Sequence, residues 1–499
     1  MKTVLAMLCL SMFVSGVLAS KQRYVVEAAD SHALALAKPE LPSLAPYTRA
    51  AILKKLGPPR AGSVSVERMT GLAELDEFTG GDGRLAIWAA RQAQLPLVIV
   101  LRNGLFTPQD LAQRLDPAHF ERRGAGVYIA RLPILVGHDA TLHINKQTRA
   151  LRLSEDSGAF LINDGRLFIT DSQVLGWRES AGAPASFRGE SDFRPFILSW
   201  GGTETYIANS RFRSLGYSES KSYGISISQY TPDMRKRIQR REPTGWIINS
   251  HFEDLWFGFY CYEANDVVIV GNEYRNNIVY GIDPHDWSER LIIANNKVSG
   301  TRQKHGIIIS REVNNSWLFG NSSTENALSG MVLDRQSAHN VVADNELLNN
   351  GSDGLTVYES SDNIIWGNTS AGNQAHGFRV RNSAGVQLYN NIAINNRYTG
   401  ISGDASRLPP GERDLTLDPY EVILSMVVVG GRLVHNGGGP IDIVRPDSVK
   451  LADVELRAPA NERGFEIKGV LGEHMHEVLD LMVRQKRAVV IRPSEQVEG

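Results

Sequence analysis

Asparagine and glycine recur at a nearly constant interval through the middle of this chain. The spacing is 23 to 25 residues in two series, which are Asn249, Asn272, Asn296, Asn321, Asn345, Asn368 and Asn391, and Gly258, Gly281, Gly306, Gly330, Gly354, Gly377 and Gly400. A repeat of this length, with apolar runs between polar turns, predicts a solenoid whose successive strands lie roughly 4.8 Å apart along the axis. The expected fold is all-β, a right-handed parallel β-helix.

Both residue types have a structural explanation. An Asn side chain at a corner of a coil can bond backbone groups that no strand ladder satisfies, and it tolerates left-handed backbone angles. A glycine suits the start of a strand that follows a turn with positive φ. We therefore assign both series to folding rather than to chemistry.

The first 19 residues have the order of a secretory signal. Lys2 precedes an apolar run from Val4 to Val14, and Val17-Leu18-Ala19 resembles a cleavage site. The run is too short to span a bilayer, so the prediction is a signal peptide over residues 1–19 and no membrane insertion. Cys9 lies inside this segment, which leaves Cys261 without a partner for an intramolecular disulfide.

The repeat divides the rest of the chain. Residues 20–135 lack it and are expected to form an N-terminal capping region, because an open β-helix end exposes unpaired strand edges. The β-helix itself is expected over residues 136–445. Residues 446–499, which have helical spacing between Met475 and Val483, are expected to form a C-terminal cap.

Two intervals ahead of Asn249 are longer than the rest. They span 38 residues, from Asp171 to Asn209, and 40 residues, from Asn209 to Asn249. The excess places insertions at residues 178–195 and 229–245. Excursions from one region of a solenoid often build a binding face or a cover, so these are interpreted as lid loops.

The total charge of the chain is close to zero, but one insertion is strongly basic. A formal net charge of −2 gives no indication of nucleic-acid binding. The insertion 229–245 is basic, however, and an anion-attracting lid is the interpretation, with a solvated loop as the alternative. Arg237 and Arg240 are taken from it as candidate substrate-binding residues.

Alignment of the repeats on their glycines predicts which side chains point outward. Alternate residues of a strand face opposite sides of the sheet, so Ile307 and Ile309 point inward and their neighbours outward. The outward position four residues after the glycine holds Ser228, Tyr262, His285, Ser310, Asp334, Tyr358 and Arg381, and the next position holds Gln229, Glu263, Asp286, Arg311, Arg335, Glu359 and Asn382. From these rows Tyr262, Arg335, Tyr358 and Arg381 are predicted to bind substrate.

One strand departs from the pattern, with the sequence Gly281-Ile282-Asp283-Pro284-His285-Asp286. Proline cannot donate a ladder hydrogen bond, and such a local loss of stability is typical of functional sites. Asp283 and His285 are both expected to point outward, so that the carboxylate orients the imidazole as a general base. Arg311, one coil further on, is expected within about 5 to 8 Å of His285. An ordinary surface ladder of charged residues is the alternative.

A histidine base beside an arginine suits a polysaccharide that bears carboxylates. The C5 proton of a uronic acid is barely acidic while the carboxylate is ionised, and bidentate pairing with arginine stabilises the enolate-like intermediate. Protonation from the opposite face then inverts C5, whereas expulsion of the 4-O substituent cleaves the chain. These residues leave open whether the protein is an epimerase or a lyase.

The motif Asp283-Pro284-His285-Asp286 resembles that of the periplasmic mannuronan C5-epimerases of alginate biosynthesis, and the similarity extends to the signal, the coils and the basic insertion. The resemblance implies a periplasmic isomerase that converts β-D-mannuronate to α-L-guluronate inside polymannuronate. It further implies that His285 is the base, that Arg311 neutralises the substrate carboxylate, that water supplies the second proton, and that the protein has a role in the alginate export complex. Asp283 and Asp286 complete the candidate catalytic group.

Secreted calcium-dependent relatives carry arrays of Gly-Gly-x-Gly-x-Asp, whereas this chain has the single similar turn Gly80-Gly81-Asp82-Gly83. We therefore predict no metal and no other cofactor.

Three other functions are weighed. The first is a polyuronate lyase on the same scaffold, which would create an unsaturated uronate. The second is an inverting glycoside hydrolase that uses Asp283 and Asp286, but this needs carboxyl groups roughly 6.5 to 9.5 Å apart across the scissile bond, and these two flank a single residue pair. The third is a polysaccharide-binding scaffold without catalysis, whose function would not depend on His285.

Overall fold

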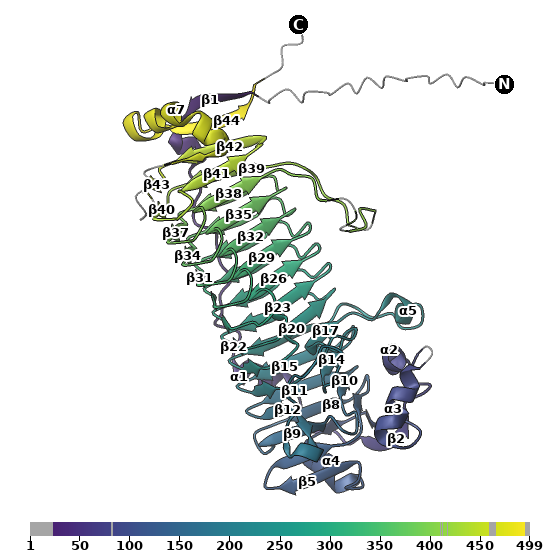
Figure 1. The fold of residues 1–499 in the computed structure, drawn as a ribbon. Helices are drawn as coiled ribbons and strands as arrows, with labels where there is room; N and C mark the ends of the chain where they lie inside the picture. Colours follow the sequence, from purple (N-terminus) through teal and green to yellow (C-terminus); the bar gives the residue numbers. More distant parts are fainter. Residues whose placement is uncertain are drawn as a thin grey trace, which may run out of the picture.

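The computed structural model describes residues 23–80, 83–409, 411, 413–416, 418–458 and 466–494, so the predicted signal peptide and residues 81 and 82 of the turn at 80–83 lie outside the described residues. The chain winds into a long solenoid whose coils each contribute short strands to three sheets, named here A, B and C (Figure 1). Strands in successive coils pair in parallel throughout the repeat, and the predicted parallel β-helix is confirmed.

Sheet A contains, in spatial order, β4 (Leu105–Phe106), β8 (Thr141–Ile144), β11 (Arg166–Thr170), β15 (Glu204–Ala208), β18 (Thr244–Ile248), β21 (Val268–Val270), β24 (Ile292–Ala294), β27 (Trp317–Phe319), β30 (Val341–Ala343), β33 (Ile364–Trp366), β36 (Val386–Tyr389), β39 (Ser425–Val429), β42 (Ser448–Ala452), β44 (Ala488–Pro493) and β1 (Tyr24–Ala29).

Sheet B contains β2 (Ser63–Arg68), β3 (Leu97–Arg102), β7 (Ile134–Val136), β10 (Leu161–Asn163), β14 (Ile197–Ser199), β17 (Gly224–Ser228), β20 (Phe257–Tyr262), β23 (Tyr280–His285), β26 (Ile307–Ser310), β29 (Met331–Asp334), β32 (Leu355–Tyr358), β35 (Phe378–Arg381), β38 (Ile401–Asp404) and β41 (Ile441–Val444).

Sheet C contains β5 (Phe120–Gly124), β6 (Val127–Ala130), β9 (Ala150–Ser154), β12 (Gln173–Arg178), β16 (Arg211–Arg213), β19 (His251–Glu253), β22 (Glu273–Arg275), β25 (Lys297–Ser299), β28 (Ser322–Thr324), β31 (Glu346–Leu348), β34 (Thr369–Ala371), β37 (Ile392–Ile394), β40 (Arg432–Val434) and β43 (Glu455–Leu456), with β13 (Ala183–Pro184) beside β12.

Helices lie at the ends and in the excursions. They are α1 (Arg49–Lys55), α2 (Asp76–Thr79), α3 (Arg84–Gln92), α4 (Pro108–Arg114), α5 (Pro232–Arg235), α6 (Gly469–Glu473) and α7 (Met475–Leu479), the 3-10 turns η1 (Ser31–Leu34), η2 (Ala73–Leu75) and η3 (Glu179–Ala181), and the π-helical turn η4 (Asp480–Arg484).

The asparagines of the repeat form a ladder inside one corner of the solenoid. The Asn345 amide donates to Oδ1 of Asn368 at 2.9 Å and to the Leu318 carbonyl at 2.9 Å, and the same pattern continues from coil to coil. Burial of these amides in full hydrogen bonding supports the structural assignment. Ser172, Ser210 and Ser250 continue this ladder into the earlier coils. Asn249 does not belong to it, because Asn249 is exposed and occupies the preceding left-handed position with φ 48°.

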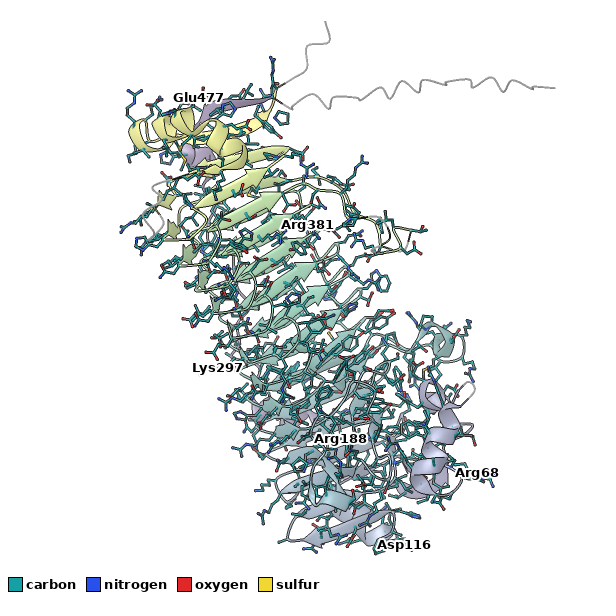
Figure 2. The ribbon with its side chains drawn as sticks, in the orientation of Figure 1. Arg68, Asp116, Arg188, Lys297, Arg381 and Glu477 are labelled. Atoms are coloured by element: carbon teal, nitrogen blue, oxygen red, sulfur yellow. The ribbon has the colours of Figure 1, made fainter. Side chains whose placement is uncertain are left out.

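The predicted outward row of sheet B is confirmed residue by residue. The strand registers place Ser228, Tyr262, His285, Ser310, Asp334, Tyr358 and Arg381 directly opposite one another in successive coils. Their inward neighbours, such as Ile307 and Leu333, are fully buried in the core. The row runs along the outer face of sheet B, and Figure 2 labels Arg381 on its C-terminal half.

The N-terminal segment differs from the predicted capping region. β1 pairs antiparallel with β44, at the C-terminal end of the solenoid. The chain then follows the outer face of sheet A, where Lys38 pairs with Asp344 at 2.7 Å and Tyr47 meets the Trp246 ring at 4.9 Å. Residues 24–56 therefore link the two ends of the solenoid instead of capping the first one.

The first coil also begins earlier than residue 136, because β3 already pairs in parallel with β7. The last strands, β42 and β43, continue past residue 445 before α6 and α7 cover the end. The sequence did not reveal these outer coils since they lack the Asn and Gly series. The predicted helical tail is present, with Val478 buried and Val483 exposed.

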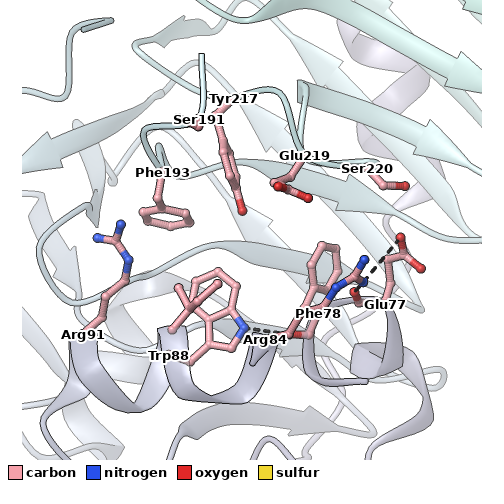
Figure 3. A pocket seen from close by; sticks show the side chains of 11 residues that line it. Glu77, Phe78, Arg84, Trp88, Arg91, Ser191, Phe193, Tyr217, Glu219 and Ser220 are labelled. Atoms are coloured by element: carbon pink, nitrogen blue, oxygen red, sulfur yellow. Dashed lines mark hydrogen bonds and ion pairs between the residues drawn. The ribbon is translucent and has the colours of Figure 1, made fainter. Parts of the chain in front are cut away.

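The N-terminal helices cover the first strands of sheet B. Trp88 of α3 packs on Phe160 with ring centroids 5.1 Å apart, and Phe78 of α2 packs on Phe196 at 5.2 Å. A cavity of about 190 Å³ remains beside Trp88, Phe193 and Tyr217 (Figure 3). The outer face of sheet B is thus covered at its N-terminal end by an aromatic cluster and carries polar side chains further along.

Two excursions leave sheet B at the same corner, where the chain turns from sheet B to sheet A. One contains α5, between β17 and β18, and the other is residues 405–424, between β38 and β39. They project to the same side, before and after the strand that holds His285 (Figure 1). We name the described residues of this second excursion, 405–409, 411, 413–416 and 418–424, the strap.

Candidate active site

The proline-containing strand β23 interrupts the ladder of sheet B as predicted. Its register with β26 is limited to Ile282 with Ile307 and His285 with Ser310, so residues 283 and 284 make no pairing on that side. Pro284 is buried opposite Cys261, which belongs to the core. The strand therefore keeps its place in the sheet while losing ladder bonds next to His285.

The residues that follow these strands have left-handed backbone angles. Asp286 has φ 34°, Arg311 φ 63°, Arg335 φ 53° and Glu359 φ 52°. In an extended strand, consecutive side chains would point to opposite faces, and a left-handed residue breaks that alternation. Asp286 can for this reason lie beside His285, its neighbour in sequence.

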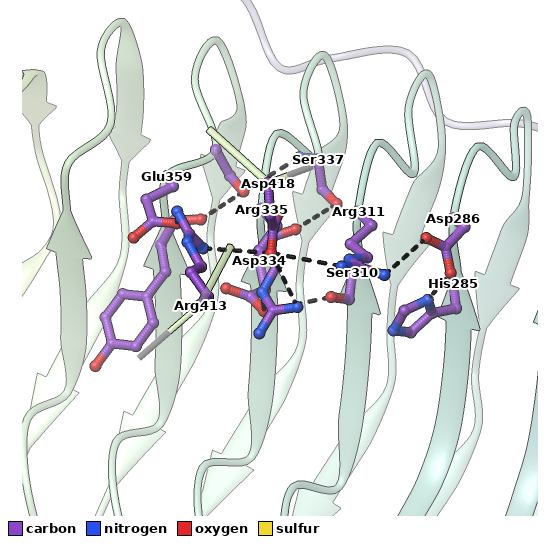
Figure 4. A network of polar contacts seen from close by, with 12 residues as sticks. His285, Asp286, Ser310, Arg311, Asp334, Arg335, Ser337, Glu359, Arg413 and Asp418 are labelled. Atoms are coloured by element: carbon purple, nitrogen blue, oxygen red, sulfur yellow. Dashed lines mark hydrogen bonds and ion pairs between the residues drawn. The ribbon is translucent and has the colours of Figure 1, made fainter. Parts of the chain in front are cut away.

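Asp286 connects His285 to Arg311. Nδ1 of His285 donates a hydrogen bond to Oδ2 of Asp286, and Nη1 of Arg311 lies 3.4 Å from Oδ1 of the same carboxylate (Figure 4). A proton held on Nδ1 leaves Nε2 as the basic nitrogen of the ring. The imidazole and the guanidinium thus lie on one outer face of the solenoid, joined through a single carboxylate.

The structure corrects the predicted role of Asp283. This side chain is 2% exposed, and its Oδ1 has no hydrogen-bond partner among the described residues. Burial raises the pKa of Asp283 to about 7, although the positive charge of His285 opposes the shift. The carboxylate that orients the imidazole is Asp286, because two residues of extended strand separate Asp283 from His285 by roughly 6.6 Å.

The electrostatic environment makes His285 a stronger base than an ordinary imidazole. Burial lowers its pKa, but the hydrogen bond to Asp286 and the charges of Asp283 and Asp286 outweigh this, and the net pKa is raised above 6.5. The charge of Arg311 lowers the pKa and so limits the increase. Asp286 thus determines both the orientation of the ring and much of its basicity.

Replacing Asp286 with Asn should move the pH dependence of the reaction. A base must be neutral, so wild-type kcat/KM should rise with pH through the raised pKa of His285. The Asp286→Asn variant loses the main group that raises this pKa, so the acidic limb should shift to lower pH, with a lower plateau because the ring is less well oriented. A pH profile measures both effects. Asp404→Asn, on a distant coil of the same face, should keep the wild-type limb, and an unmoved limb in Asp286→Asn would contradict this account.

Four more predicted residues lie along the same face. Tyr262 is the register partner of His285 and has the Lys221 ammonium 3.3 Å from its ring centre. Arg335 lies 3.4 Å from Asp334, and Arg381 lies 4.1 Å above the ring of Tyr358. These side chains thus form a row, with one member from each coil, that runs from Tyr262 past His285 to Arg381.

Of the basic insertion, Arg235 reaches the end of this row, whereas the predicted Arg237 and Arg240 do not join it. Arg237 pairs with Asp76 of α2, and Arg240 contacts His138 and the buried Asp164, the latter at 3.3 Å. Arg235 makes a bidentate pair with Glu263 at 2.7 Å. The structure therefore places Arg237 and Arg240 against the N-terminal region, where they hold the insertion in place, instead of on the face that carries His285.

Sequence reasoning missed two residues of the strap. Arg413 pairs with Glu359 at 2.6 Å, and Asp418 lies 3.2 Å from Arg335 and 3.6 Å from Arg311. The repeat gives no register for a chain that leaves the solenoid, so alignment of coils could not place them. The sequence indicated only that a Pro/Gly-rich excursion follows the repeat, and not which of its residues return to sheet B.

Comparisons with known proteins agree with this architecture. Residues 258–407 match the model of the right-handed β-helix region, which confirms the predicted handedness. The chain is 51% identical to the mannuronan C5-epimerase of Pseudomonas putida, over 95% of this chain and 91% of the relative, and 51% identical to mannuronan C5-epimerase AlgG of Azotobacter vinelandii, over 95% and 90%.

The chain belongs to the mannuronan C5-epimerase family. A solved structure described as the periplasmic alginate epimerase AlgG superposes on this epimerase with a TM-score of 0.83, at 48% identity over 85% of this chain and all of the other. The predictions of an isomerase and of a periplasmic location are thereby confirmed.

The described part of the epimerase contains no group of three or more His, Cys, Asp or Glu residues that could hold a metal ion. None of its described helices is long and apolar enough to cross a membrane.

Proposed function

We propose that this epimerase inverts C5 of β-D-mannuronate units inside polymannuronate and so produces α-L-guluronate units. The family supports the reaction, and the outer face of sheet B supports an extended substrate, since it presents one polar or aromatic side chain per coil. The observation that carries the proposal is the connected series His285, Asp286 and Arg311 on that face.

His285 and Arg311, at the two ends of this series, have different roles in the reaction. Arg311 pairs with the C5 carboxylate of the sugar, which lowers the energy of the enolate-like intermediate. Nε2 of His285 removes the C5 proton, and the electrons of the broken C–H bond pass into the carboxylate group. Water then delivers a proton to the opposite face of C5, and the imidazolium returns its proton to solvent. Asp286 stabilises the imidazolium while it exists.

The flanking residues align the polymer. We assign Tyr262, Tyr358, Arg335 and Arg381 to sugar units on either side of the reacting one. Aromatic faces can pack on sugar rings, and guanidinium groups can pair with the carboxylates of neighbouring units.

Proton NMR of polymannuronate after incubation with the purified protein tests the proposal. Guluronate signals should appear while the ultraviolet absorbance of an unsaturated uronate stays at the background level. The comparisons do not favour the lyase alternative, and absorbance without guluronate would establish it instead.

We also propose that the epimerase acts on polymer in transit through the periplasm and belongs to the alginate export assembly. Its family and periplasmic location support this proposal. In a producing strain, the His285→Asn variant should restore polymer export to a deletion of the gene, although the exported polymer should lack guluronate. If the variant fails to restore export while present at wild-type level, the scaffold role is wrong.

A further inference from the structure

The strap is held against the corner that follows the sheet B strands. Nε2 of Gln336 donates to the Pro419 carbonyl at 2.9 Å, and within the strap the Leu408 amide donates to the Tyr420 hydroxyl at 2.7 Å, which joins its two arms. Arg413 adds its pair with Glu359 at 2.6 Å. These contacts position Asp418 over the coils that carry Arg311 and Arg335.

Asp418 brings one carboxylate to three guanidinium groups. Its Oδ2 lies 3.2 Å from Nη1 of Arg335, 3.6 Å from Nη2 of Arg311 and 3.7 Å from Nη1 of Arg413 (Figure 4). The side chain is 10% exposed, yet Oδ2 makes no well-aligned hydrogen bond to the described residues. The carboxylate is thus held by charge more than by directed bonds.

Arg311 has a carboxylate beside each of its two terminal nitrogens. Nη1 lies 3.4 Å from Oδ1 of Asp286, and Nη2 lies 3.6 Å from Oδ2 of Asp418. Asp286 must stay in place because it also holds Nδ1 of His285. A substrate carboxylate that pairs with Nη2 of Arg311 therefore competes with Asp418 for this nitrogen.

We propose that Asp418 is an intramolecular substitute for the substrate carboxylate and that it determines which ligands bind to the outer face of sheet B beside His285. This inference rests on the proposed function of Arg311. Asp418 also contacts Arg335 in the next coil. A ligand that displaces Asp418 therefore binds most tightly when it supplies one carboxylate to Arg311 and another to Arg335. Polymers with a carboxylate on every unit meet that requirement, whereas neutral polysaccharides and single uronates do not.

Removal of the Asp418 charge should strengthen the binding of polyuronates. The test uses calorimetric titration of polymannuronate and of a short mannuronate oligomer into His285→Asn protein, so that binding is measured without turnover. Adding Asp418→Asn should lower Kd roughly fivefold, and the decrease should be larger for the short oligomer, which cannot replace both contacts as effectively. Asp414→Asn is the matched control, because it makes the same charge change at an exposed position of the strap and should leave Kd unchanged.

Kinetics on the active protein distinguish two roles of Asp418: competition with the substrate carboxylate for Arg311, and positioning of the Arg311 side chain. Asp418→Asn alone should lower KM and leave kcat within about twofold, since Arg311 remains and only a competitor is lost. A lower kcat with unchanged KM, or a Kd equal to that of the Asp414→Asn control, would overturn the inference. Failure of the proposed function would look different, because the wild-type protein would then form no guluronate at all.

Discussion

The His285→Asn variant should lose epimerase activity on polymannuronate by roughly a thousandfold or more, because general base catalysis typically contributes factors of 10² to 10⁴. Asn has the same Cβ and Cγ positions as His and an amide nitrogen near the place of Nδ1, so it can still donate a hydrogen bond to Asp286. The fold and the outer face of sheet B should therefore be retained. His305 in the next coil cannot take over, since burial lowers the pKa of its imidazole to about 4 and makes it a poor base. The rate of guluronate formation by NMR measures the effect.

A second histidine provides the control for this substitution. His251 lies on sheet C, exposed and paired with Glu273 at 2.9 Å, so His251→Asn should leave the rate unchanged. Binding of polymannuronate to His285→Asn should stay within about threefold of wild type, because the imidazole is assigned to proton transfer and not to affinity. Guluronate formation by His285→Asn at the rate of the His251→Asn control would remove His285 from the catalytic group.

Replacing Arg311 with Met should reduce kcat/KM by roughly 10² to 10³, because the guanidinium is assigned to the charge that develops on the carboxylate. Arg311→Lys should recover only part of this loss, since an ammonium group supplies one point charge and cannot pair with a carboxylate through two parallel bonds. The variant also removes a positive charge that lowers the pKa of His285, so its acidic limb should move to higher pH. That shift is opposite in direction to the one expected for Asp286→Asn.

The opposite pH shifts distinguish a specific role of Arg311 from general damage to the protein. Arg275→Met, on the outer face of sheet C, removes an exposed arginine of similar size and should change neither the rate nor the pH profile. If Arg311→Met keeps the kcat/KM of this control with polymannuronate, the carboxylate is neutralised by another group.

The coils and their register could be predicted because the same physical requirement recurs at each turn. From Asn272 to Asn391 each coil places an asparagine at the corner and a glycine at the start of the sheet B strand, and this regularity aligned His285 with Ser310 correctly. The weak coils before Asn272 were harder to align, because a serine such as Ser250 can satisfy the same corner.

The site was predicted less completely than the fold. Strand alternation correctly placed His285 on the outer face but assigned the orienting role to Asp283, because alternation takes no account of a left-handed residue after the strand. Arg237 and Arg240 were assigned by charge alone, and their acidic partners, Asp76 and Asp164, are distant in sequence. Asp418 could not be found because the course of the strap depends on tertiary contacts and not on a repeat.

Incubation of polymannuronate in deuterated water, with wild-type and His285→Asn protein in parallel, tests the central claim most directly. If His285 exchanges the C5 proton with solvent, every guluronate unit formed by the wild-type protein carries deuterium at C5, and the variant forms neither guluronate nor deuterated mannuronate. Guluronate that retains its original C5 proton, or equal deuterium incorporation by the two proteins, would show that the imidazole joined to Arg311 through Asp286 is not the base.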